Sequence, residues 1–312
     1  MTAPAAKLGR GRRIGRWRPL TDNPVFIKEL RGRMRGARAF VVLTFYLGLL
    51  GAFTGLMYLA VAESAMSVSG QSNVGEVGRT LFVSIVAIEM LLVAFIAPAF
   101  TAGAISSERE HQTFDLLRTT LLGPTSFVLG KLLSAMLYVL LLLLAAVPLQ
   151  SIAFFFGGVA ETEVILSFVI LIVTALLFST VGIFFSSRAH RTLSASVLTY
   201  TSVAFFTFGL PIMIGGVVLM FGFSINNVQS TTPQIALLYV LGAIICTNPA
   251  ATALLTQYVL LNQQTIGTFT YTLSGGETLT LISPWIPFTL LYLVLTVVFF
   301  ALAVRRVHQI EN

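Results

Sequence analysis

The one long charged segment between two apolar runs lies at residues 105–131, and its chemistry suits binding better than catalysis. Residues 108–111 are Glu, Arg, Glu and His, and Asp115 follows His111 at the spacing of neighbours on one helical face. Charges of both signs on a short segment can form ion pairs and hydrogen bonds with another surface. The apolar runs hold no Ser–His–Asp set and no paired carboxylates, so the sequence predicts no catalytic site.

The Gly130-Lys131 pair does not complete a nucleotide site. A phosphate-binding loop needs Ser or Thr after the lysine and an earlier glycine at a fixed, shorter spacing. Here Leu132 follows the lysine, and Gly123 is too far from Gly130. We therefore interpret Lys131 as an interface lysine whose ammonium reaches the polar headgroups. If the chain takes part in active transport, the energy must come from another chain.

Composition indicates that most of the chain lies in a membrane. Apolar residues make up 56% of the sequence and charged residues 10%, whereas a soluble domain carries about 25% charged residues. A soluble enzyme and a disordered chain are both excluded. Runs of about 20 apolar residues can cross the hydrocarbon core as helices, and they lie at 39–62, 81–103, 132–156, 164–185, 194–222 and 284–304. We therefore predict an all-α integral membrane protein with a six-span transmembrane domain at 39–304.

The positions of lysine and arginine predict the orientation. Of the 19 basic residues, all but Arg79 lie before the first run or after the second, fourth or sixth. Because cytoplasmic loops carry the excess of positive charge, we expect both termini in the cytoplasm, with tails at 1–21 and 305–312. A membrane surface also explains the net charge of +7, so no nucleic-acid partner is predicted.

Residues 22–38 predict an amphipathic helix lying flat on the inner leaflet. Asn23 suits the N-cap, and Pro24 suits the first helical position. Apolar and basic residues recur at helical spacing on two stripes, and the basic stripe consists of Lys28, Arg31, Arg35 and Arg38. The alternative is that these charges only set the topology.

Residues 235–261 are apolar but are interrupted by Thr247-Asn248-Pro249. The first part, 235–246, would reach only about 18 Å as a helix, which is too short to cross the bilayer. We interpret 235–261 as an outer re-entrant helical hairpin that dips into the membrane and returns. The alternative, a seventh kinked span, would place the C-terminus outside, against the charge rule.

Residues 106–123 predict a cytoplasmic helix between the second and third runs, with Ser106 or Ser107 as its cap and Gly123-Pro124 at its end. Its apolar face is too small to make it stable alone, so it would need another loop or a separate protein as a partner. The alternative is an ordinary charged loop.

Glu89 is the ionisable residue placed deepest in a predicted span and is the possible intramembrane polar site. It could contact a substrate or a proton, or it could bond to a neighbouring helix. The three histidines lie in separate segments, which argues against a metal site.

Two segments resemble the permease subunits of type-2 ABC exporters. The first is NPVFIKELRGRMRG, residues 23–36. The second is AISSEREHQTFDLLRTTLLGPTSFVLGK, residues 104–131. The second segment has the family's E-R-E run, its T-[LF]-D-L-L run, its Gly-Pro turn and its Gly-Lys pair. Pro98 lies late in the preceding span, as in the family, and Phe114 stands where leucine is commoner.

The resemblance implies a division of labour between two chains. In this family the segment after the second span is a coupling helix that docks in a cleft of a soluble ATPase, and the N-terminal helix also touches that ATPase. The implied ATPase-coupling residues are Glu108, Arg109, Glu110, Thr113, Phe114, Asp115, Leu117 and Arg118. The implied secondary contacts, to the ATPase or to lipid, are Lys28, Glu29, Arg31, Arg35, Arg188 and Arg191.

The implied partners are the ABC ATPase, a second copy of the permease or a related permease, and membrane lipids. ATP and Mg²⁺ would be bound by the ATPase, and no cofactor by this chain, which is then not itself an enzyme. The implied location is a prokaryotic inner membrane. The leading hypothesis is therefore the permease subunit of an ATP-driven exporter. The alternative is a six-span membrane scaffold or binding protein that transports nothing. A secondary transporter would show repeated halves, which the sequence lacks.

Overall fold

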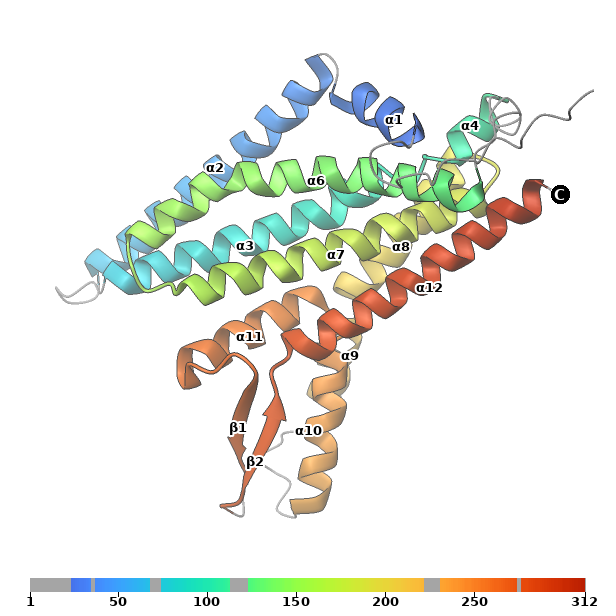
Figure 1. Ribbon diagram of the computed structural model, residues 1–312. Helices are drawn as coiled ribbons and strands as arrows, with labels where there is room; N and C mark the ends of the chain where they lie inside the picture. Colours follow the sequence, from blue (N-terminus) through green and yellow to red (C-terminus); the bar gives the residue numbers. More distant parts are fainter. Residues whose placement is uncertain are drawn as a thin grey trace, which may run out of the picture.

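The computed structural model describes residues 24–34, 37–67, 74–112, 123–221, 231–273 and 276–311. The N-terminal and first long helices are α1 (Pro24–Met34) and α2 (Ala37–Ser67). The remaining described elements, shown in Figure 1, are α3 (Val74–Ala99), α4 (Ser106–Glu110), α6 (Pro124–Phe155), α7 (Glu161–Arg188), α8 (Thr192–Ala204), the π-helix η1 (Phe205–Gly209), α9 (Leu210–Phe221), α10 (Thr231–Ile245), α11 (Pro249–Gln263), β1 (Thr268–Thr272), β2 (Thr278–Ile282) and α12 (Trp285–Glu311).

Six helical segments in the described ranges are long and apolar enough to cross a membrane, which confirms the predicted all-α, six-span fold. They are Ala39–Ala62, Gly75–Ala99, Pro124–Phe155, Glu161–Arg188, Thr192–Met213 and Trp285–Gln309. Several helices extend beyond the apolar runs into charged residues, as α7 does at Glu161 and Arg188. At the C-terminus α12 runs on through Glu311, so residues 305–311 of the predicted tail continue the last helix, and their cytoplasmic location stays a prediction. The predicted tail at 1–21 lies outside the described residues.

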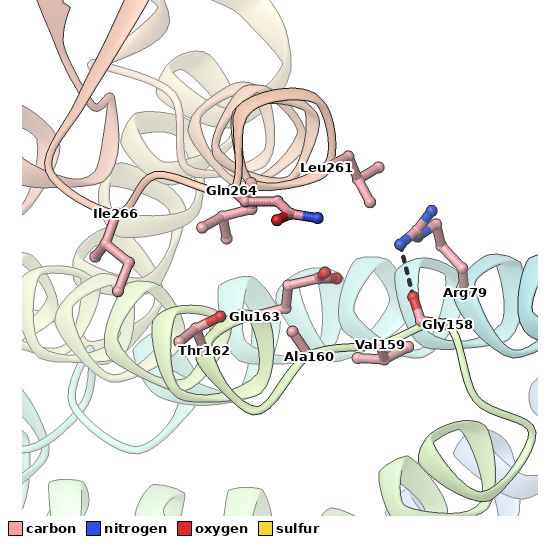
Figure 2. A pocket seen from close by; sticks show the side chains of 10 residues that line it. Arg79, Gly158, Val159, Ala160, Thr162, Glu163, Leu261, Gln264 and Ile266 are labelled. Atoms are coloured by element: carbon pink, nitrogen blue, oxygen red, sulfur yellow. Dashed lines mark hydrogen bonds between the residues drawn. The ribbon is translucent and has the colours of Figure 1, made fainter.

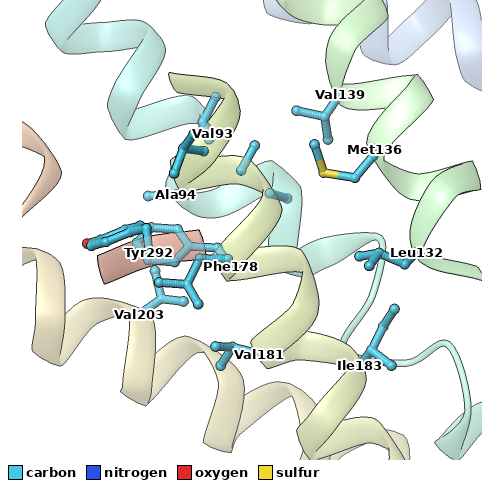
Figure 3. Close-up of a cluster of buried hydrophobic side chains, with 14 of the residues drawn as sticks. Val93, Ala94, Leu132, Met136, Val139, Phe178, Val181, Ile183, Val203 and Tyr292 are labelled. Carbon is cyan, nitrogen blue, oxygen red and sulfur yellow. The ribbon is translucent and has the colours of Figure 1, made fainter. Parts of the chain in front are cut away.

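Helix α7 is the centre of the bundle. In the most apolar part of α7, 67% of the residues are buried, against 17% in α2 and 22% in α12. It packs against α3, α6, α8 and α12. Figure 3 shows its Phe178, Val181 and Ile183 among side chains of these neighbours, such as Met136 of α6 and Tyr292 of α12. Helix α7 is apolar on all sides, which explains its central position, whereas the peripheral helices keep one face for lipid.

The fifth span is not one continuous α-helix. Between α8 and α9, residues 205–209 form a π-helical turn, and Pro211 follows it. Proline has no N–H, so a carbonyl one turn earlier loses its helical partner. The side-chain amide of Asn248 supplies the donor, bonding to the carbonyls of Phe206 at 3.0 Å and Thr207 at 2.8 Å. The fifth span and the α10–α11 break are therefore joined at the bulge.

The predicted break at Thr247-Asn248-Pro249 separates α10 from α11. Asn248 is the N-cap of α11, its side chain accepting from the Ala251 N–H at 2.9 Å, and Pro249 is the first helical residue. Helix α11 packs against α7 and α12, and α10 projects away from the bundle (Figure 1). Whether this hairpin lies in the membrane stays a prediction.

A short antiparallel β-hairpin connects α11 to α12 and was not predicted. Its register pairs Thr268 with Ile282 and Thr272 with Thr278. The sequences TFTYT and TLTLI alternate between exposed and half-buried residues, as expected of strands with one covered face. The alternation is a signal that a search for long apolar runs overlooks.

Candidate functional site

Helices α1 and α4 lie at the same end of the bundle, beside the first turns of α6 (Figure 1). Lys131 of α6 connects them. Its Nζ lies 2.9 Å from Glu108 Oε1 of α4, 3.1 Å from Glu29 Oε1 of α1 and 2.7 Å from the Ala104 carbonyl. Its side chain is only 2% exposed. Two segments far apart in the sequence are thus fastened to one transmembrane helix.

This environment corrects the interpretation of Lys131 as an interface lysine. A buried ammonium costs free energy unless it is paired and its donors are used. All three N–H donors of Lys131 have an acceptor here, and the Phe127 ring centroid lies 5.1 Å from Nζ. The two carboxylates carry one negative charge more than the ammonium neutralises, and Arg33 lies 3.9 Å from Glu29 Oε2 on its other side. We call Lys131, Glu29, Glu108 and the Ala104 carbonyl the lysine junction.

Helix α4 is also bonded to the end of α7 and the start of α8. Ser186 Oγ of α7 accepts the N–H groups of Ile105 at 2.9 Å and Ser106 at 3.0 Å. Glu110 Oε2 accepts from Thr192 N at 3.1 Å and from Thr192 Oγ1 at 2.6 Å. The carboxylate thus satisfies one of the open N–H groups at the N-terminus of α8. These bonds favour the ionised form and lower the pKa of Glu110.

The predicted helix at 106–123 differs from the structure in two respects. Helix α4 begins at Ser106, but the residue before it, Ile105, makes no side-chain cap, and Ser106 is instead buried against Ser186. It then ends at Glu110, and Gln112 has a φ of 57° in the left-handed region. A right-handed helix cannot continue through that conformation. The interval 113–122 lies outside the described residues.

The structure describes three of the eight predicted coupling residues, and their surroundings differ. Glu108 belongs to the lysine junction, Glu110 is exposed and bonded to α8, and burial together with the nearby charge of Arg306 lowers the pKa of Arg109. The other five predicted coupling residues lie outside the described part of the chain: Thr113, Phe114, Asp115, Leu117 and Arg118.

Most of the predicted secondary contacts are exposed around the same end. Lys28 and Arg31 of α1, Arg188 at the end of α7 and Arg191 before α8 all have exposed side chains. Arg35 lies outside the described residues. Glu29 is the exception, since it belongs to the lysine junction.

Sequence reasoning missed Arg33, which bonds α1 to the end of α3. Its Nη2 donates to the Phe100 carbonyl at 2.9 Å, and its guanidinium lies 5.3 Å from the centroid of that ring. Burial lowers the pKa of Arg33. The spacing of Glu29 and Arg33, four residues apart and 3.9 Å from each other in the structure, was the available signal.

Glu89 is fully buried inside the bundle, with 0% exposure. Its Oε2 accepts a hydrogen bond from Gln150 Nε2 of α6 at 2.8 Å. Glu89 Oε1, Gln150 Oε1 and Tyr46 Oη are buried with no hydrogen-bond partner in the described part of the chain. The bond to a neighbouring helix that the sequence allowed is therefore present, and a contact with substrate or a proton stays a prediction.

Comparison with known proteins agrees with this architecture. A family model described as "ABC-2 family transporter protein" matches residues 24–309, which covers both the α1–α4 end and all six candidate spans. No curated protein matches the chain. A match over so much of the chain shows the family. The chain belongs to the ABC-2 transporter family, and it is a multi-pass transmembrane permease of an ABC transporter.

Proposed function

We propose that this permease is the membrane subunit of an ATP-driven exporter and that a separate ATPase chain binds the end formed by α1 and α4. The observation that carries the proposal is the lysine junction. A force applied to α1 or α4 acts through Glu29 or Glu108 on Lys131, and hence on α6. Glu110 and Ser186 give α4 further connections to α8 and α7.

The side of the membrane follows from the charge distribution. The α1–α4 end carries the exposed basic residues described above, and Arg79 is the one basic residue of the chain expected at the opposite end. The positive-inside rule then puts the α1–α4 end and both termini in the cytoplasm, in contact with a soluble ATPase. The membrane is the inner membrane of a prokaryotic cell.

The chemistry of ATP belongs to the partner. The sequence has no complete phosphate-binding loop, so ATP and Mg²⁺ are bound by the ATPase chain. Two permeases, either two copies of this chain or one copy with a related permease, enclose the pathway and assemble with two ATPases. Binding of ATP favours one arrangement of the ATPases, and the lysine junction passes that preference to the spans as a shift in population.

The experiment combines co-purification with a coupling assay. The full chain, carrying an affinity tag, is expressed together with an ABC ATPase encoded beside it and is purified in mild detergent. We expect the ATPase in stoichiometric amount. We also expect Glu110→Lys to reduce ATPase recovery or transport-coupled hydrolysis, while Glu161→Lys, at the opposite end, leaves both unchanged. Purification of the folded chain without any ATPase would favour a membrane scaffold and overturn the proposal.

A further inference from the structure

A cavity of about 490 Å³ lies at the end of the bundle opposite α1 and α4, where α3 and α7 begin and α11 ends. This volume is within the range of small-molecule sites. Figure 2 shows polar side chains from three elements facing the same space: Arg79 of α3, Glu163 of α7 and Gln264 after α11. Apolar side chains complete the lining, among them Val159, Leu261 and Ile266.

The two charges in this cavity have opposite signs but do not pair with each other. Among the described residues, the ion pairs within 4.0 Å are Glu29–Arg33, Glu29–Lys131 and Glu108–Lys131. Arg79 and Glu163 therefore face the cavity as separate charges.

Each charge is held in place by a neutral partner. Arg79 Nη2 donates to the Gly158 carbonyl at 2.7 Å, and Arg79 Nε is buried without a partner in the described residues. Gly158 has a φ of 81°, and a Cβ there would overlap the backbone of Gly75, so the loop requires glycine at this position. Glu163 is only 4% exposed, and its Oε2 accepts from Gln257 Nε2 at 2.7 Å.

We propose that this cavity binds a compact zwitterion, whose anionic oxygens bond to Arg79 and whose ammonium bonds to Glu163. An anion alone would meet the repulsion of Glu163, and a cation alone would meet that of Arg79. A ligand with both charges satisfies both groups, and its carbon part packs on Val159 and Leu261. Two sources supply this chemistry: a free amino acid or short peptide, and the headgroup of an ethanolamine phospholipid. The proposal does not depend on the exporter function.

The test uses the purified full chain in non-ionic detergent, without ATPase or nucleotide, and isothermal titration calorimetry. The probes are alanyl-alanine and glycerophosphoethanolamine. Two blocked probes, N-acetyl-alanyl-alanine and alanyl-alanine amide, each lack one charge. We expect at least one zwitterion to bind. Each blocked peptide should bind at least about tenfold more weakly than alanyl-alanine, because it loses a hydrogen bond to a charged group. Binding of only the peptide or only the headgroup probe identifies the source.

Variants locate the site. Glu163→Gln and Arg79→Gln should each weaken binding about tenfold, and Arg79→Lys, which keeps the positive charge, should weaken it less than Arg79→Gln. Glu161→Gln is the matched control, because Glu161 lies in the same first turn of α7 but does not line the cavity. Thermal unfolding checks each variant, and if Arg79→Gln does not fold, the blocked probes and Glu163→Gln decide. Failure of both zwitterions to bind the wild-type chain, or equal binding to Glu163→Gln, would overturn the proposal and leave the exporter function unaffected.

Discussion

Replacing Lys131 by methionine tests the lysine junction directly. Methionine keeps the length and the apolar stem of the side chain but removes the ammonium, so Glu29 and Glu108 are left facing each other. Loss of one member of a fully buried ion pair costs about 3–5 kcal/mol, whereas a surface pair is worth less than about 1 kcal/mol. Lys131 is 2% exposed and the two carboxylates are 24% and 17% exposed. This intermediate burial gives an expected cost of about 2–3 kcal/mol.

The assay is thermal unfolding of the full chain in detergent, together with transport-coupled ATP hydrolysis in the reconstituted complex. For a chain of 312 residues, a loss of this size should lower the unfolding temperature by roughly 3–5 °C and should reduce coupling. The triple variant Lys131→Met, Glu29→Gln, Glu108→Gln removes the uncompensated charges and should recover at least half of the stability but not the coupling. Lys28→Met, on the exposed face of α1, is the control. A triple variant no more stable than the single one would refute the electrostatic reasoning.

Three further changes test other contacts. The bonds from Thr192 lower the pKa of Glu110, so the α4–α8 contact is complete above the ordinary glutamate pKa and is lost as pH falls through the lowered value. The protection of backbone amides at the start of α8 against hydrogen exchange should therefore fall at that acid pH. In Glu110→Ala this protection should already be lost at pH 7. Asn248→Ala should lower the free energy of unfolding by about 2 kcal/mol, because it removes both the cap of α11 and the donors to the π-helical turn. Asn248→Asp keeps the cap but not the donors. Equal stability of Asn248→Asp and wild type would therefore contradict the stabilising role of these two donated bonds. Glu89→Gln, with transport measured across pH, separates the two roles of Glu89: an unchanged profile with normal assembly removes it from the mechanism, and a lost pH dependence assigns it a proton.

The spans and the break before α11 could be predicted because their signals are local. Twenty apolar residues in a row require a helix in lipid, and Asn248-Pro249 is a cap followed by a first helical residue. The β-hairpin was missed because its strands are short and half polar, although their alternation was visible. Pro211 is a local signal for an interrupted helix, but the donor that stabilises the π-helical turn comes from residue 248, and no local pattern indicates that contact.

The composition of the candidate site could be predicted only in part. The charged segment after the second span and the basic helix before the first were both visible in the sequence. Their connection was not, because Glu29 and Lys131 are 102 residues apart and no periodicity relates them. The bond between Glu89 and Gln150 spans 61 residues and is equally invisible to spacing. Single-sequence reasoning thus finds the pieces of a polar contact but not the tertiary packing that brings them together.

The order of residues in the lysine junction has a consequence for how the chain is made. Glu29 and Glu108 both precede Lys131, so the ribosome has released the two carboxylates before the lysine emerges. Both counter-charges of Lys131 are therefore already synthesised when the third span enters the bilayer. A circularly permuted chain that begins at α6 would have to insert Lys131 before either counter-charge was synthesised.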